Sequence, residues 1–176
     1  YITQYKELDA LRLVDQKEMI ELLNFYLAGK VITEEFRSTF DRKTRSEWNT
    51  FGFKGMSGAM FLNVLVKHIG DERKLAEQLR LVLHIPSDTA DGREKMKAFL
   101  QFLENLISSK QVKKRQIQPA RTPFFVSAWW HIQAPEQWPV FYPRTRQTLE
   151  LEGLYTSSQN PIEDYFTFRD CFMSLA

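Results

Sequence analysis

Apolar residues recur at three- and four-residue intervals along most of this chain, and that spacing restricts it to a helical fold. The clearest run consists of Met96, Phe99, Leu100, Leu103, Leu106 and Ile107. No segment has the pattern of a buried strand. We therefore predict a mainly α, multi-helix globular domain with little or no sheet, built as one compact unit or as two helical lobes.

Capping residues combined with this periodicity predict where the helices begin and end. Helices are expected over 6–28, 33–42, 58–69, 71–85, 91–107, 122–132, 143–151 and from 161 onward. Side chains that can accept a hydrogen bond from the first helical turn are expected to serve as N-caps: Thr33, Ser57, Asp71, Asp91 and Asn160. Gly29 is expected to end the first helix, because glycine adopts the left-handed conformation that terminates helices.

Composition excludes several classes of protein. The 176 residues are 43% hydrophobic with a formal net charge of +2, which excludes general disorder. No apolar run approaches the ~18 residues of a membrane span, and no signal-peptide pattern opens the chain. The single cysteine, Cys171, excludes an internal disulfide and fits a reducing compartment, so we expect a cytoplasmic protein. The first residue, Tyr1, and the helical pattern at the last residues indicate a segment of a longer protein.

A polar, basic stretch at 110–121 is the best candidate boundary. It is expected to link an N-terminal helical lobe, 1–109, to an aromatic-rich C-terminal lobe, 122–176. Its positive side chains, with no acid among them, are Lys110, Lys113, Lys114, Arg115 and Arg121. Such a patch favours binding to a phosphate backbone. The alternative is a solvated connector whose charges only keep it soluble.

The only glycine-dense stretch, 51–58, leads into a predicted helix. The backbone N–H groups at a helix N-terminus favour an anion, so Gly55, Ser57 and the adjacent Lys54 are candidate phosphate contacts. A helix-hairpin-helix contact with DNA fits this pattern. The alternative is a tight turn in which glycine allows close helix packing. A nucleotide P-loop is excluded, because no Gly-Lys-Ser/Thr follows the glycines.

Aromatic and arginine residues are concentrated in the C-terminal third. If Trp130, Trp138 and Tyr142 were exposed, they could stack on nucleobases. If buried, they form the core of that region. Arg144 and Arg146 follow Pro143 at the start of a short predicted helix. They are candidate contacts for a phosphate or a partner's carboxylate, or else ordinary surface arginines.

The sequence offers no motif for catalysis. His68, His84 and His131 lie far apart, and paired cysteines and metal-protease motifs are absent. Acid-x-lysine triplets occur, but without the strand scaffold that nucleases use. We therefore expect no catalytic residue, no metal and no cofactor. A hydrolase with a carboxylate pair that the sequence does not reveal is a minor alternative.

One resemblance arises from the aromatic segments. The stretch Phe124-Phe125-Val126-Ser127-Ala128-Trp129-Trp130, followed by Trp138-Pro139-Val140-Phe141-Tyr142, resembles a pattern in helical modules of bacterial restriction and phage-defence proteins. Those modules lie beside McrB-type AAA+ motors. The stretch from Gly55 to Phe61 is similar to the same group. The resemblance implies a specificity or adaptor module in a larger defence machine, and no motor or nuclease motif lies in this chain.

Two functions are suggested by these patterns. The leading hypothesis is a nucleic-acid-contacting accessory domain of a multi-domain bacterial defence protein, which binds DNA phosphates through its basic residues. The alternative is a protein-interaction module that docks a neighbouring domain or subunit through an apolar helical surface. Neither hypothesis involves a membrane.

Overall fold

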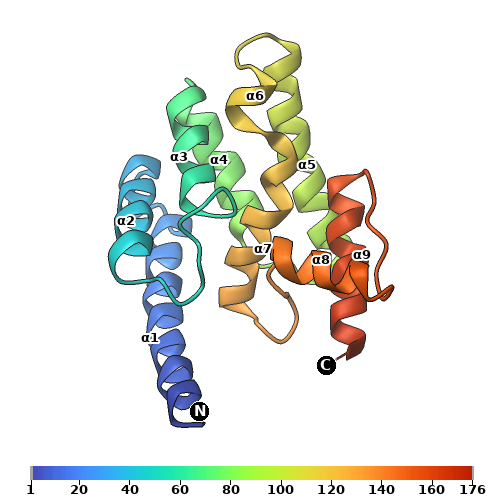
Figure 1. Cartoon of the computed structure of the whole chain (residues 1–176). Helices are drawn as coiled ribbons and strands as arrows, with labels where there is room; N and C mark the ends of the chain where they lie inside the picture. Colours follow the sequence, from blue (N-terminus) through green and yellow to red (C-terminus); the bar gives the residue numbers. More distant parts are fainter. Residues whose placement is uncertain (1, 176) are drawn as a thin grey trace.

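A computed structural model describes the backbone of residues 2–175 and the side chains of residues 7–175. Within this range the chain forms helices and no strand, which confirms the mainly α prediction (Figure 1). In chain order the elements are α1 (Ile2–Leu27), α2 (Thr33–Ser46), α3 (Ala59–His68), α4 (Glu72–Leu83), α5 (Thr89–Ser108), α6 (Lys114–Ile117), the 3-10 turn η1 (Pro119–Arg121), α7 (Thr122–Gln133), α8 (Pro143–Leu151) and α9 (Pro161–Leu175).

Helix α7 lies at the centre of the molecule and packs against α1, α4, α5 and α9. Adjacent side chains on a helix point about 100° apart, yet Trp129 and Trp130 are both buried because neighbours surround α7. The Trp129 ring lies 5.1 Å from Phe36 and 4.6 Å from Phe40, both on α2. Residues from the two halves of the chain thus share one hydrophobic core.

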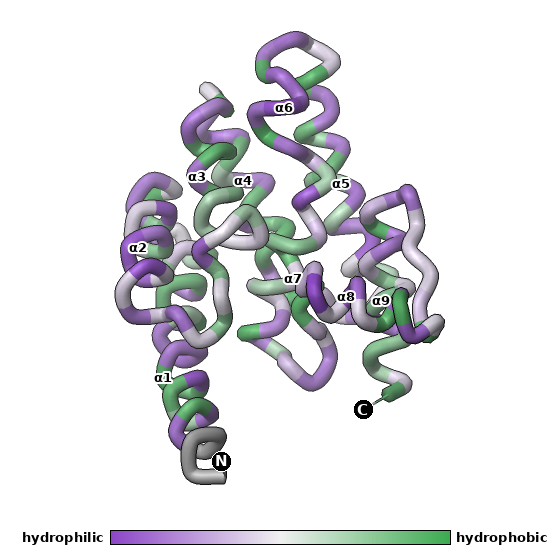
Figure 2. Tube along the Cα trace, in the orientation of Figure 1, coloured by the Kyte–Doolittle hydropathy of each residue, from purple (hydrophilic) through white to green (hydrophobic). Residues whose placement is uncertain are grey.

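The stretch expected as a basic linker, 110–121, contains α6 and η1, two short elements that the periodicity did not predict. Its apolar side chains Val112, Ile117 and Pro119 are buried. Four residues are too few to show a helical repeat in sequence, which explains why α6 was missed. Lys110, Lys113, Lys114 and Arg115 are exposed, and Figure 2 shows hydrophilic residues along this segment near α6.

Three predicted helix ends are confirmed. Gly29 follows α1 with φ +72°, and its N–H donates to the Tyr26 carbonyl as expected of a glycine terminator. The Asp71 side chain accepts from the backbone N–H of Lys74 at the start of α4. At the start of α9, Asn160 Oδ1 accepts from the N–H groups of Ile162 and Glu163.

Three predicted N-caps are wrong. Thr33 is buried and its hydroxyl pairs with the Tyr26 hydroxyl at 3.0 Å, so α2 begins without a side-chain cap. Ser57 does not cap α3, which follows Gly58 instead. Helix α5 begins earlier than expected: Asp88 is its N-cap and accepts from the N–H of Asp91.

The first half of α1 extends beyond the other helices (Figure 1). Leu11, Leu13 and Val14 are all more than half exposed there, whereas Met19 and Leu23 in the second half are buried. Among the described residues, no helix combines the length and apolarity that crossing a bilayer requires.

Candidate nucleic-acid interface

One end of the molecule presents a cluster of positive side chains on α6 and on the helix ends beside it. Helix α3 packs against α6, and Gln116 Nε2 lies 3.4 Å from His68 Nδ1. A shallow groove brings Lys74 of α4 next to Gln111, just before α6. We call the exposed cations gathered here the basic apex: Lys67, Lys74, Lys110, Lys113, Lys114 and Arg115.

The cations of the basic apex are not neutralised by ion pairs with other described residues, so their charge can attract an anionic ligand. Within the described part of the chain, none of its cations forms an ion pair. The acids at the same end are Asp71, Glu72 and Glu104. Asp71 already accepts the Lys74 backbone N–H as a helix cap. The surface therefore carries an excess of positive charge that solvent alone balances.

The basic run at 113–115 was predicted from sequence, whereas Lys67 and Lys74 were missed. Lys67 lies in the last turn of α3 and Lys74 in the first turn of α4. Each is a single lysine in an amphipathic helix, so no local signal connects either one to the basic run. Only the packing of α3 against α6, and of α4 against α5 just before α6, brings them to the same end of the molecule.

The glycine-dense turn does not form the expected anion cradle. The N–H of Gly58 donates to the Gly55 carbonyl at 2.9 Å, and the N–H of Ala59 donates to Phe53 O at 2.7 Å. Met60 N–H also donates to Gly55 O, at 3.1 Å. The turn itself thus uses the donors at the start of α3, and none of these three points to a ligand.

Lys54 remains a candidate contact, separate from the basic apex. It is exposed in the loop before α3, whereas the basic apex adjoins the other end of that helix. Ten residues of helix span about 15 Å. The same loop adjoins the start of α8, since Phe53 stacks with Tyr142 at 6.4 Å. Lys54 and the exposed Arg144 therefore flank one aromatic contact.

Arg146 is held by a buried carboxylate rather than left free. Its Nε donates to Asp164 Oδ2 at 3.0 Å, and Asp164 is only 6% exposed. The Tyr155 hydroxyl and the Ser158 N–H also donate to Asp164. Arg146 thus supplies the counter-charge that a buried carboxylate needs, and we do not include it in the interface.

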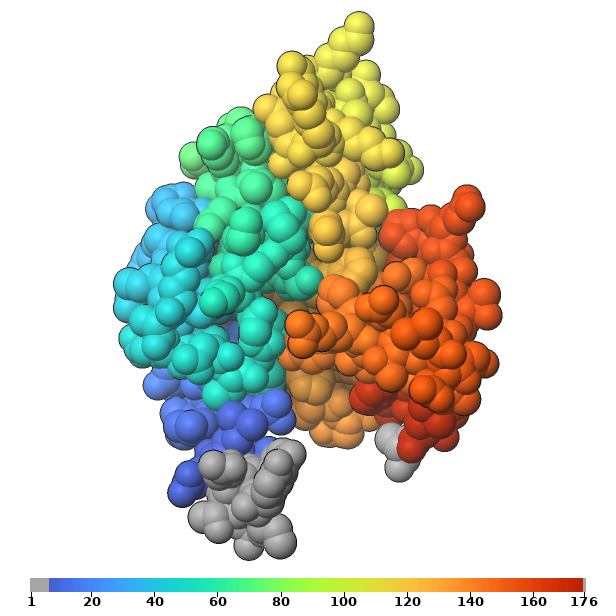
Figure 3. All heavy atoms as spheres, in the orientation of Figure 1, coloured from blue at the N-terminus to red at the C-terminus, as the bar shows by residue number. Residues whose placement is uncertain are grey.

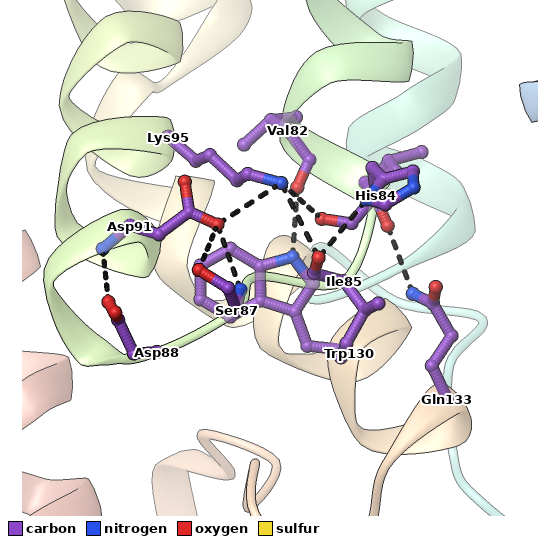
Figure 4. Close-up of polar contacts among 10 residues, drawn as sticks. Val82, His84, Ile85, Ser87, Asp88, Asp91, Lys95, Trp130 and Gln133 are labelled. Atoms are coloured by element: carbon purple, nitrogen blue, oxygen red, sulfur yellow. Dashed lines mark hydrogen bonds and ion pairs between the residues drawn. The ribbon is translucent and has the colours of Figure 1, made fainter.

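Trp130 and Trp138 are 0% and 1% exposed, so the stacking alternative is wrong for both and the core alternative holds. Figure 4 shows how the buried Trp130 satisfies its one donor: Nε1 donates to the Val82 carbonyl at 2.8 Å. Pro86 prevents α4 from continuing, so the last carbonyls of α4 need partners from other elements. Gln133 donates to the next carbonyl, that of Leu83, at 2.9 Å, and Lys95 of α5 donates to that of His84 at 3.1 Å.

Tyr142 is only partly buried, but its hydroxyl donates to the Phe51 carbonyl at 2.9 Å. Burial raises the pKa of Tyr142 to about 12, so the phenol stays neutral at physiological pH. Stacking at Tyr142 stays a prediction.

In residues 7–175, no group of three or more His, Cys, Asp or Glu side chains is placed to hold a metal ion. The three histidines lie on separate elements. His84 is exposed after α4, and His131 lies in the last turn of α7.

No family model, curated protein or solved structure matches this chain. The geometry of the surface is therefore the basis for assigning a function.

Proposed function

We propose that this chain is a nucleic-acid-contacting accessory domain that binds the phosphate backbone through its basic apex. The observation that carries the proposal is the gathering of Lys113, Lys114 and Arg115 with Lys67 and Lys74, all exposed and free of ion pairs in the described structure. The resemblance of the aromatic segments to modules of bacterial defence proteins supports a place in a larger cytoplasmic restriction system that acts on DNA.

The shape of the surface is compatible with duplex DNA. Segments around 50–60, 113–121 and 143–151 all reach the face drawn in Figure 3. These segments carry Lys54, the run Lys113–Arg115 and Arg144. Helix α3, which lies between the loop that carries Lys54 and the basic apex, is about 15 Å long, less than one turn of duplex, about 34 Å, so one DNA molecule can extend along it. Binding would displace counterions and weaken as salt rises.

Charge reversal at the centre of the basic apex tests the proposal. We expect Lys113→Glu, Lys114→Glu and Arg115→Glu together to weaken DNA binding at least tenfold at low salt. The slope of log Kd against log salt should fall by about 2–3, since each lost phosphate contact removes about 0.9. The measurement is fluorescence anisotropy with labelled double- and single-stranded DNA at several salt concentrations.

A matched control changes net charge equally at other exposed cations: Lys17→Glu, Lys30→Glu and Arg42→Glu. This variant should retain the wild-type salt slope, because its substitutions lie away from the basic apex. Equal losses in the two triple variants would show that only overall charge matters. Absence of binding by the wild-type domain at low salt would reject the proposal.

Protein interaction is a second candidate function, favoured by the exposed first half of α1. Leu11, Leu13 and Val14 are 57%, 66% and 56% exposed, and such apolar exposure is typical of docking surfaces when it is contiguous.

Hydrogen exchange tests the role of this half of α1. In the isolated domain, amides of residues 8–14 should exchange at least about 100-fold faster than those of 19–26, because they lack tertiary packing. A docking partner should slow exchange at 8–14 selectively. If residues 8–14 are as protected as 19–26 in the isolated domain, this half of α1 is already packed and its role as a docking surface is rejected.

A further inference from the structure

A pocket lies between α1, the loop after α2 and the C-terminal end of α7. Its volume is about 380 Å³, within the range of small-molecule sites. It combines charged, neutral polar and aromatic groups from segments far apart in the chain: Asp9, Arg12, Gln16, Phe51, His131 and Tyr142. It shares no residue with the basic apex, so ligand binding here does not rest on that cluster. Tyr142 is the one lining residue that is also a candidate for base stacking.

The inner wall of the pocket is held in place by hydrogen bonds to backbone carbonyls. His131 Nδ1 lies 2.9 Å from the Trp138 carbonyl, so Nδ1 carries a proton and Nε2 is the nitrogen left for a ligand. Gln16 Nε2 donates to Ile132 O at 2.9 Å, and the Tyr142 hydroxyl donates to Phe51 O. His131, Gln16 and Tyr142 thus each donate one hydrogen bond within the protein and keep acceptor capacity for a ligand.

The inner wall is also uncharged. Burial lowers the pKa of His131, the hydrogen bond to the Trp138 carbonyl opposes that shift, and the nearby Arg12 guanidinium lowers the pKa further. Neutral His131 therefore presents Nε2 as an acceptor at physiological pH. Tyr142 and Gln16 are neutral beside it.

The rim of the pocket carries one charge of each sign. Asp9 and Arg12 lie one turn apart on α1, and their closest oxygen and nitrogen are 3.8 Å apart, longer than a hydrogen bond. Within the described residues neither has another ionic partner. Both side chains are substantially exposed, with Asp9 at 70% and Arg12 at 48%. Such a loose, exposed ion pair contributes little free energy, so a ligand can separate the two side chains at small cost.

We propose that this pocket binds a small zwitterion of the size of a free amino acid. The ligand's ammonium would donate to the Asp9 carboxylate and to His131 Nε2. Its carboxylate would accept from the Arg12 guanidinium, which can offer two parallel donors. The ligand side chain would pack against Phe51 and the exposed Leu13 at the pocket mouth.

The test uses three probes of one shape. L-phenylalanine carries both charges, L-phenylalanine amide lacks the carboxylate, and 3-phenylpropionate lacks the ammonium. Each is titrated into the domain while the ring nitrogens of His131 are followed by NMR. We expect L-phenylalanine to give a saturable shift at Nε2 and to bind at least about tenfold more tightly than either analogue, since each charged hydrogen bond contributes about that factor.

Two variants assign the contacts. Arg12→Gln should weaken L-phenylalanine binding to the level of the amide. His131→Asn keeps a donor near the position of Nδ1 but removes Nε2, and it should weaken binding at least about tenfold. Arg42→Gln is the matched control, because Arg42 forms a similarly loose pair with Glu47 at 3.9 Å on α2; it should bind as the wild type does.

The analogue series and Arg12→Gln decide the question even if His131→Asn does not fold. No saturable shift with L-phenylalanine would overturn the proposal. Equal binding of the amide would also overturn it, because the Arg12 contact with a carboxylate would then have no role. Equal loss in Arg12→Gln and Arg42→Gln would likewise count against the site.

Discussion

Substituting alanine for Gly58 is expected to destabilise the protein by about 3 kcal/mol or more, which lowers Tm by about 6–12 °C in a chain of this size. A Cβ atom at Gly58 would lie 2.0 Å from the Phe53 carbonyl oxygen and 2.8 Å from its carbon. Both are backbone atoms, so no side chain can rotate to relieve the clash. The Phe53 carbonyl also accepts from the N–H of Ala59, so moving it would break that hydrogen bond.

Gly55 is the matched control for this substitution. It lies earlier in the same turn, and a Cβ added there would meet no heavy atom within 4 Å. Gly55→Ala should therefore change the free energy of unfolding by less than about 0.5 kcal/mol. Thermal and urea unfolding of both variants measure the contrast. Similar stabilities would show that the turn adjusts and that Gly58 is not required for its packing.

Substitutions at the two adjacent tryptophans of α7, Trp129 and Trp130, are expected to give the second large effect on stability. Trp130→Phe and Trp129→Phe remove the same atoms from fully buried sites, so each leaves a similar cavity. Only Trp130 donates a hydrogen bond, to the Val82 carbonyl, whereas Trp129 Nε1 is buried without a partner. Trp130→Phe leaves that carbonyl unsatisfied, and we expect it to cost about 1–3 kcal/mol more than Trp129→Phe.

Urea unfolding monitored by circular dichroism measures this difference without relying on tryptophan fluorescence, which both substitutions change. The slopes of the two transitions should agree, so that a difference in midpoint reports stability alone. Equal losses would mean that the Val82 carbonyl finds another donor. A larger loss for Trp129→Phe would mean that its packing between Phe36 and Phe40 outweighs the hydrogen bond.

The sequence predicted the structure best where a feature depends only on residues a few positions away in the chain. Helix α8 runs over Pro143–Leu151 as predicted, because proline at the first position is a local signal. Asn160 and Asp71 cap their helices for the same reason: an N-cap side chain needs only the amides two or three positions along the chain.

Sequence reasoning failed where a distant partner competes for the same group. Thr33 has the right side chain for a cap, but the Tyr26 hydroxyl engages it. The start of α3 is satisfied by carbonyls of the preceding loop, so Ser57 is not needed as a cap. For α5, the predicted cap Asp91 lies inside the helix, and Asp88, three residues earlier, accepts from its N–H.

The candidate sites show the same contrast between local features, which the sequence reveals, and long-range ones, which it does not. Contiguous cations at 113–115 are visible in sequence, and the structure places them on the surface. Burial of Trp130 and Trp138 was not decidable, because it depends on how many elements surround α7 and the adjoining turn. The pocket that contains His131 joins α1 to α7 across more than half of the chain, and no spacing rule connects such positions.

The central position of α7 has a consequence for synthesis on the ribosome. Phe36 and Phe40 emerge early, yet a ring that packs on both of them, that of Trp129, emerges about ninety residues later. Until that segment leaves the exit tunnel, the earlier helices expose apolar faces to solvent. Long-range contacts of this kind slow folding and prolong exposure to aggregation. The nascent chain should therefore recruit chaperones until translation has passed α7.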